Sequence, residues 1–305
     1  MYRLPFPRMP SGKRARQQRQ QAAAAAVRTP PPVRSKGAGG VRARQASPRA
    51  LAIAGGVVLL AAIAIVLGVV LGSSGGGSST VTTGDIKGLP AIGDQNWPGA
   101  LQGAAEANNL FKGIPQKGEV LGNPKAKVEM EMFIDVQCPV CDSYEINDLP
   151  TVVNKYIQNG KVQMHLKPWA FLGGAGSQSF SGRLGVIAAS FQNKGYEYAK
   201  VLYDNQGPEE SGWLTGQTMA KIAASVTGLD LARWQKDVNG SAAQSVASEV
   251  DKLATQKQVQ GTPTILVGPP GGRLRNVETP AELAQGSAPT LQDTERALNN
   301  ALAGI

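Results

Sequence analysis

The 305-residue chain contains very few residues of the kinds that bind metals: two cysteines and a single histidine, His165. A structural zinc site takes four ligands, so this chain could complete such a site only together with another chain. The sequence also has no phosphate-binding glycine loop and no recognisable Ser/His/Asp set. A structural bridge between the two cysteines would close so short a loop that it would remove little chain entropy. We therefore expect no metal and no cofactor.

Acidic residues are absent from the first 49 positions, which contain twelve Lys or Arg. This segment cannot bury enough apolar surface to offset the entropy of ordering, so we expect a disordered tail. Residues 50–305 carry 19 basic and 22 acidic side chains, so the net charge of +9 comes from the tail. Basic arms can bind nucleic acid, but only Tyr2 and Phe6 supply aromatic rings here. We interpret the tail as a membrane-orientation signal attracted to anionic lipid, and we expect no nucleic-acid partner.

Charged residues are also absent from residues 50–72, which are rich in Ala, Val, Leu and Ile. At about 1.5 Å per residue, a helix of this length crosses a hydrocarbon core of about 30 Å. Five basic residues lie closely before the segment, and no charge follows it until Asp85. The positive-inside rule then predicts a single-pass cell-membrane protein with a cytoplasmic N-terminus and an extracytoplasmic remainder. A cleaved signal peptide is the alternative, but its basic region would be unusually long and no clear cleavage site follows.

These features divide the chain into four predicted parts. They are a disordered basic tail at 1–49, a transmembrane helix at 50–72, a flexible linker at 73–99 and a folded domain at 100–305. The linker begins with a run of Ser, Gly and Thr, a composition that behaves as flexible coil. We expect it to let the folded domain reach substrates near the membrane.

The two cysteines are spaced for thiol chemistry, in the order Cys138-Pro139-Val140-Cys141. A strand-like run precedes them and a helix-like run follows, so Cys138 is expected at a helix N-terminus, where unpaired N–H groups stabilise a thiolate. Pro139 suits the first helical turn because it needs no partner for an N–H. Cys141 then falls on the same helix face. We assign Cys138 as the attacking thiol and Cys141 as the shielded, resolving thiol of a redox-active disulfide.

The rest of the folded part alternates between strand and helix patterns, which indicates an α/β fold. Lys161–Lys167 alternates apolar residues with a face that carries His165 and the lysines, and this predicts a half-buried strand. Pro150 lies inside a helical run and predicts a kink. The expected elements are a helix at 100–111, a strand at 127–135, a helix at 139–158, a strand at 161–167, helices across 177–258, a strand at 264–267 and a helix at 291–302. We expect breaks in the helical stretch near residues 206–208, 228 and 239–240.

Several motifs in this order resemble those of the DsbA-like thiol–disulfide oxidoreductases, and more narrowly of their membrane-anchored bacterial branch. The resemblance covers roughly residues 110–303 and implies a thioredoxin-like fold with a helical insertion at about 174–258. The motifs are Gly113-Ile114-Pro115, Leu121-Gly122-Asn123-Pro124, Phe133-Ile134-Asp135-Val136-Gln137-Cys138-Pro139-Val140-Cys141, Leu149-Pro150 with Tyr156, Gly160-Lys161-Val162 and Gly261-Thr262-Pro263-Thr264.

The resemblance also implies a substrate-binding surface beside the cysteines. In the family, the Thr-Pro pair that matches Thr262 and Pro263 has a cis peptide bond and packs against the two cysteines. Main-chain groups at this position pair with a substrate strand, which tolerates many sequences. We expect Thr262 and Pro263, together with Pro139 and Val140, to contact the substrate.

Two positions depart from the family pattern. Strong oxidases usually carry His where this chain has Val140, and Val140 offers neither charge nor hydrogen bond to the Cys138 thiolate. Relatives often have a buried acid six residues before the first cysteine, where this chain has Met132. Glu131 and Asp135 lie nearby, but strand alternation places Glu131 on the opposite face from Met132. The group that manages the Cys141 proton stays open.

The sequence therefore predicts a membrane-anchored, extracytoplasmic protein disulfide oxidoreductase. In the favoured direction it oxidises the thiols of exported proteins through a mixed disulfide, and a membrane redox partner resets the cysteine pair. Val140 keeps a reductase or isomerase using the same cysteines as an alternative. A non-enzymatic module that binds peptides as a chaperone is a second alternative.

Overall fold

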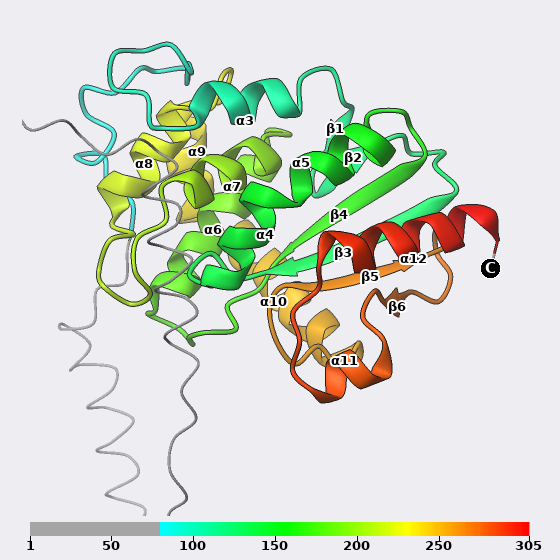
Figure 1. The fold of residues 1–305 in the computed structure, drawn as a ribbon. Coiled ribbons are helices and arrows are strands. Elements are labelled where there is room, and N and C mark those ends of the chain that lie inside the picture. Colours follow the sequence, from blue (N-terminus) through cyan, green and yellow to red (C-terminus); the bar gives the residue numbers. More distant parts are fainter. Residues whose placement is uncertain (1–79, 305) are drawn as a thin grey trace, which may run out of the picture. The chain divides into compact units, whose positions relative to one another are not determined.

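The computed structural model describes residues 80–304, so the predicted tail, the predicted transmembrane helix and the start of the linker lie outside the described residues. Its centre is a six-stranded sheet in the order β1-β2-β4-β3-β5-β6 (Figure 1). The central strand β3 runs parallel to β4 and antiparallel to β5. The strands are β1 (Gln116–Lys117), β2 (Val120–Gly122), β3 (Val128–Ile134), β4 (Val162–Pro168), β5 (Thr264–Gly268) and β6 (Arg275–Asn276).

Helices cover both faces of the sheet and gather at one end of it. In Figure 1, α12 lies in front of the sheet, α10 behind it, and α6 to α9 stand together at the end where β3 leads into α4. Five helices, α6 to α10, follow β4 and precede β5, which is the position expected for the insertion. The helices are α3 (Ala104–Leu110), α4 (Pro139–Asn147), α5 (Leu149–Val152), the π-helix η1 (Val153–Ile157), α6 (Gln178–Ser190), α7 (Gly195–Asp204), α8 (Gly216–Ala224), α9 (Leu231–Val238), α10 (Ser241–Gln256), α11 (Pro280–Ala284) and α12 (Leu291–Ala303).

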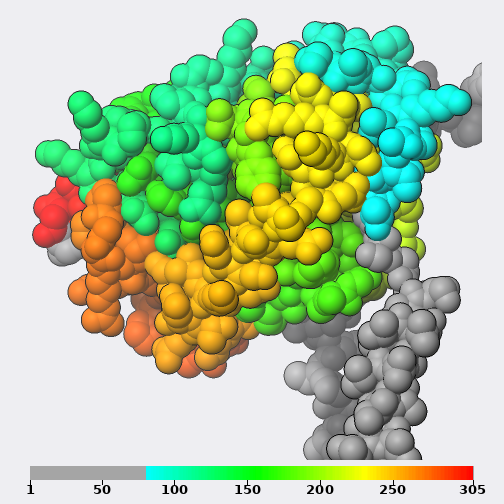
Figure 2. Space-filling view, turned by 180° about the vertical axis from the view of Figure 1, so that it is seen from behind, coloured from blue at the N-terminus to red at the C-terminus, as the bar shows by residue number. Residues whose placement is uncertain are grey.

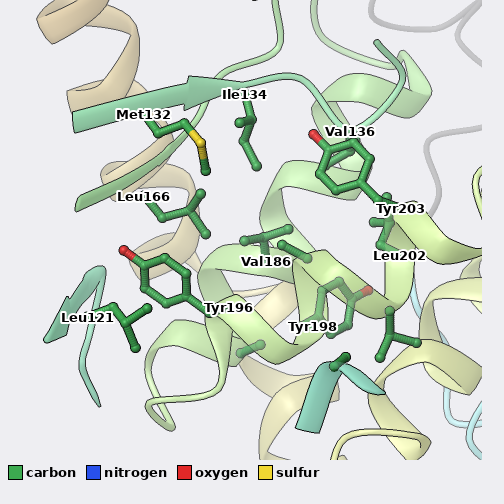
Figure 3. Packing of buried hydrophobic residues seen from close by; sticks show 14 of the residues in the cluster. Leu121, Met132, Ile134, Val136, Leu166, Val186, Tyr196, Tyr198, Leu202 and Tyr203 are labelled. Carbon is green, nitrogen blue, oxygen red and sulfur yellow. The ribbon is translucent and has the colours of Figure 1, made fainter. Parts of the chain in front are cut away.

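Strand β3 is buried on both faces, and its alternation separates two hydrophobic clusters. Met132 and Ile134 point toward Val186 of α6 and Tyr196 of α7 (Figure 3) and belong to the larger cluster. Phe133 points the other way, into a smaller cluster with residues of α10. Figure 2, seen from behind, shows the yellow to amber atoms of α10 over this side of the molecule. The helix closes the second face of the sheet, as in α/β folds.

The cover provided by α10 corrects the prediction for β4, which was expected to leave its lysine face in water. Lys167 is buried and forms an ion pair with Glu119, and the His165 side chain is only 18% exposed. Polar residues remain on this face because they pair with one another: Glu131 of β3 binds Lys257 at the end of α10 at 2.6 Å. The alternation along a strand shows which of its residues are polar. These polar residues are exposed to water only on a face of the sheet that no helix covers.

The helix that follows the cysteines is divided rather than simply kinked. α4 ends at Asn147, α5 begins at Leu149, and Pro150 lies in the first turn of α5. Pro150 has no N–H to bond to the preceding turn, so the break falls just before it and the proline occupies a position that tolerates it. The chain then continues through the π-helix η1.

The described part of the predicted linker contacts the folded domain. Val81 is fully buried, and its carbonyl accepts hydrogen bonds from Gln235 and Asn239. Ile92 forms a β-bridge with Asp230. Residues 80–99 therefore pack against the helical insertion, and the folded part begins earlier in the chain than the predicted boundary at residue 100. Within residues 80–304, no helix has both the length and the apolar character needed to cross a membrane.

The smaller cluster gives a direct test of the cover provided by α10. We expect Phe133→Ala to lower the free energy of unfolding by about 3–5 kcal/mol, because the ring is fully buried between the sheet and α10. Urea unfolding of the full-length protein, followed by fluorescence, measures this change. Leu283→Ala is the control, since that side chain is 42% exposed and should change stability by less than about 0.5 kcal/mol. Equal effects of the two substitutions would contradict the packing described here.

Candidate active site

The two cysteines lie where β3 leads into α4. Cys138 is the N-cap residue of α4, in an extended conformation, and Pro139 occupies the first turn. Cys138 is 6% exposed and Cys141 is fully buried, and both are free thiols. The structure therefore places the pair at a helix N-terminus with the second thiol beneath the first, as the spacing predicted.

A buried carboxylate holds the loop between β3 and α4. Asp135 is 1% exposed, and its Oδ1 accepts hydrogen bonds from the Gln137 N–H (2.8 Å) and the Ser179 hydroxyl (2.7 Å). Its Oδ2 accepts the Leu172 N–H at 2.7 Å. The Tyr203 hydroxyl donates to the Asp135 carbonyl at 2.9 Å. Asp135 thus acts as a structural anchor between the sheet, the insertion and the loop after β4.

Residues of the insertion also bind the main chain at the cysteines. The Gln206 amide donates to the carbonyl of Val136 at 2.9 Å and to that of Cys138 at 3.3 Å. The Gln137 side-chain oxygen accepts the Trp213 indole N–H at 3.2 Å. Sequence reasoning predicted only a helix break near Gln206 and gave it no role. Its part in the site depends on a long-range contact that no local pattern signals.

The loop before β5 lies against the first cysteine. The Cys138 thiol donates to the Thr262 carbonyl oxygen at 3.2 Å, and the Thr262–Pro263 peptide bond is cis, as the family resemblance implies. Pro263 is buried, whereas Val140, two residues after Cys138, is 43% exposed. The loop before β5 therefore contacts Cys138 through a main-chain group, and the first turn of α4 presents an exposed apolar side chain.

The two thiols have opposite electrostatic environments. A hydrogen bond from Cys141 is the main cause that lowers the pKa of Cys138 to about 6, against the opposing effect of burial. Burial raises the pKa of Cys141 well above its usual range, and the neighbouring Cys138 adds to this. A thiolate at Cys138 is thus stabilised at neutral pH, while Cys141 holds its proton. Such a pair can undergo thiol–disulfide exchange with distinct roles for its two sulfur atoms.

The two acids considered from the sequence are each bound to other partners. Met132 is fully buried and apolar, Glu131 is paired with Lys257 on the opposite face, and the Asp135 oxygens already accept three hydrogen bonds. Across the described part of the chain, no three His, Cys, Asp or Glu side chains come together in a way that could hold a metal ion.

Comparison with known proteins gives a consistent set of relatives. A family model described as "Thioredoxin" matches residues 116–284. The chain is 26% identical over 174 residues to a probable disulfide bond formation protein D of Bacillus cereus, covering 56% of this chain and 77% of that protein. It is 24% identical over 172 residues to the protein of the same description from Bacillus anthracis, covering 56% and 76%.

A solved structure shows the same fold. The crystal structure of oxidised BdbD from Bacillus subtilis superposes with a TM-score of 0.52 at 19% identity, covering 63% of this chain and 98% of that one. The likeness concerns the arrangement of sheet and helices.

The lowered pKa of Cys138 predicts how the reduced protein responds to pH. Alkylation of Cys138 by iodoacetamide should rise with pH through a midpoint of about 6 and then level off. Because the folded pKa lies below the unfolded value of about 8.5, the thiolate stabilises the reduced fold fully above that value. This contribution is lost as the pH falls through about 6.

Rates measured on full-length protein in detergent, together with urea unfolding at several pH values, test both statements. Cys138→Ser is the control and should remove the change centred near pH 6 from both measurements. A midpoint near 8.5 would contradict the described environment of the thiol.

Proposed function

Because the chain belongs to the thioredoxin family, as a DsbA-like thiol–disulfide oxidoreductase, we propose that it oxidises the thiols of exported proteins through Cys138 and Cys141. The family membership confirms the resemblance seen in the sequence motifs, and it makes the chain an enzyme. The direction of exchange, its site residues and its place in the cell form the proposal.

Oxidation of a substrate takes two exchange steps. A substrate thiolate attacks the Cys138 sulfur of the Cys138–Cys141 disulfide, so a mixed disulfide forms and Cys141 leaves with the electron pair and takes up a proton. A second substrate thiolate then attacks the substrate sulfur, and Cys138 leaves as a thiolate. Two electrons pass from the substrate to the cysteine pair, and one disulfide is gained by the substrate. A membrane-bound oxidant must then remove these electrons for the next cycle.

The observation that carries this direction is the unequal environment of the two thiols. A thiol with a low pKa is a good leaving group, and stabilising its thiolate favours the reduced pair, which makes the disulfide more oxidising. The pKa of Cys138, lowered to about 6, supports this role. Cys141 is fully buried and is therefore shielded from attack by the substrate.

The substrate is proposed to lie along the loop before β5. The Thr262 carbonyl lies 3.2 Å from the Cys138 sulfur, so the thiol of a substrate strand beside this carbonyl would reach that sulfur. Pairing through main-chain groups suits a substrate class of unrelated sequences. Pro139 and the exposed Val140 would contact the substrate from the other side of Cys138.

Anchoring in the membrane completes the proposal. The uncharged segment 50–72 follows a basic tail, and this order supports a cytoplasmic N-terminus with the catalytic domain outside. The anchor would keep the domain close to its membrane oxidant and to emerging exported chains. Val140 supports the second candidate, a reductase or isomerase, because it lacks the charge that strengthens the oxidising character of a Cys138 disulfide.

The reduction potential of the cysteine pair tests the direction. Full-length protein in detergent is equilibrated against glutathione buffers. We expect a reduction potential nearer that of a strong oxidase, about −120 mV, than that of a reductant, about −270 mV. Alkylation of the thiols after acid quenching reads the redox state. A value at the reductant end would favour the second candidate.

The roles of the two cysteines predict which variant traps a substrate. When mixed with a peptide that contains an internal disulfide, Cys141→Ser should accumulate a mixed disulfide between Cys138 and the peptide, because the resolving thiol is missing. Cys138→Ala should form none. Non-reducing electrophoresis and mass spectrometry of the adduct measure this. Equal trapping at both positions would contradict the assignment.

Val140 gives a further prediction on the strength of the oxidant. Val140→His should lower the pKa of Cys138 below about 6 and raise the reduction potential by about 30 mV, a tenfold change in the equilibrium constant. The physical cause is an imidazolium beside the thiolate. Val140→Gln is the control, since it is polar without a charge and should shift the potential much less. An unchanged potential in Val140→His would show that this exposed position does not act on the thiolate.

A further inference from the structure

This chain lacks the acid that relatives carry before the first cysteine, but α4 carries a buried acid, Glu145, after the second cysteine. Glu145 follows Cys141 by four residues in α4, so the two side chains lie on the same helix face, one turn apart. Glu145 is 2% exposed, and its Oε1 is buried without a hydrogen-bond partner among the described residues. A carboxyl group in such a place is costly unless it is protonated or has a function.

The neighbours of Glu145 come from α4 and α7. Lys200 of α7 is 1% exposed, and its Nζ lies 2.6 Å from the Asp204 Oδ1, so this lysine is already neutralised by one carboxylate. Asp142 adds a further negative charge from α4. The two carboxyl groups of Glu145 and Asp204 thus face one buried cation, and an ionised Glu145 would leave an excess negative charge inside the protein.

These surroundings set the protonation of Glu145. Burial raises its pKa to about 8; Lys200 opposes this effect, while Asp204 and Asp142 add to it. The group is therefore mostly protonated at neutral pH and can release its proton at slightly higher pH. An acid or base works best in catalysis when its pKa lies close to the working pH.

The charges of Glu145 and Cys141 both act on one buried tyrosine. Tyr203 of α7 is fully buried and lies next to Val136 in Figure 3. Burial raises its pKa, and negative charges on Cys141 and on Glu145 raise it further. Tyr144 and Tyr196 also sense the charge of Glu145. One phenol hydroxyl therefore lies within electrostatic reach of both the resolving thiol and the buried acid.

We propose that Glu145 exchanges a proton with Cys141 in each half of the redox cycle, taking the place of the absent strand acid at Met132. This inference rests on the proposed function. When the Cys138–Cys141 bond breaks, the departing Cys141 sulfur gains the Glu145 proton, and the resulting Glu145 carboxylate regains a proton from water at neutral pH. When Cys141 attacks a mixed disulfide on Cys138, the ionised form of Glu145 takes the Cys141 proton, the new S–S bond forms, and the partner sulfur leaves as a thiolate.

Substitution of Glu145 tests the proposal on the step that uses Cys141. Reduced full-length protein in detergent is mixed with oxidised glutathione, and the Cys138–glutathione adduct is followed by rapid acid quench and mass spectrometry. In Glu145→Gln, resolution of the adduct by Cys141 should slow about 100-fold at pH 7, the usual effect of removing an acid–base group. Alkylation of Cys138 should change less than about threefold.

The pH profile separates proton transfer from a structural role. In the wild-type protein, the resolution rate should rise with pH and bend near pH 8, where Glu145 loses its proton. In Glu145→Gln this bend should be absent, and the rate should rise only as Cys141 itself ionises. Glu131→Gln is the matched control, because Glu131 is also a buried glutamate close to the cysteines in sequence but lies on the opposite face of the sheet. Its profile should keep the bend.

A measurement on the unaltered protein covers the case in which Glu145→Gln does not fold. Infrared difference spectra between oxidised and reduced protein should contain the signal of a protonated carboxyl group whose titration midpoint differs between the two states. Identical titration in both states, or a bend that survives in Glu145→Gln, would overturn the inference while the cysteine pair still cycles. A wild-type pair that does not cycle at all would instead overturn the proposed function.

Discussion

The hydrogen bonds to the Asp135 carboxylate hold together the parts of the molecule that meet at the cysteines. Their donors come from the active-site loop, from Ser179 of the insertion and from the loop after β4. A buried carboxylate requires such partners, since an unpaired one would cost several kcal/mol. The same bonds therefore position Cys138 at the start of α4 and attach the helical insertion to the sheet, so the geometry of the thiols depends on residues far apart in the sequence.

The N-terminus and the inner face of α4 carry different parts of the candidate active site. Its N-terminus points Cys138 toward the Thr262 carbonyl and the exposed Val140, where a substrate can approach. Its inner face carries Cys141 and, one turn later, Glu145, both closed off from water. In the proposed mechanism, exchange with a substrate takes place at the helix end, whereas proton transfer is confined to the buried interface with α7. Separation of the two tasks lets the leaving thiolate stay reactive while the resolving thiol stays protected.

Elements whose own pattern determines their burial were predicted well. β3 and α12 lie within one or two residues of the expected ranges, because every second residue of β3 is apolar and faces the larger cluster, and α12 is amphipathic with a Thr cap. The polar face of β4 was expected in water, but α10 covers it and its charges pair internally. A further break between α6 and α7, where Asn193 takes a positive φ of 58°, was missed. The short α11 and β6 carry too few residues to produce a periodic signal.

The sequence by itself determined the reactive pair, its place at a helix N-terminus and its family, because these depend on residues close together along the chain. Only the tertiary structure decided which acid accompanies Cys141 and which groups hold the loop. Glu145 is one turn from Cys141 in the sequence as well, but its burial and its altered protonation come from α7, whose Lys200 and Asp204 lie more than fifty residues further on. Charge and solvent exclusion act through space, so they become known only when the distant helix has been placed against α4.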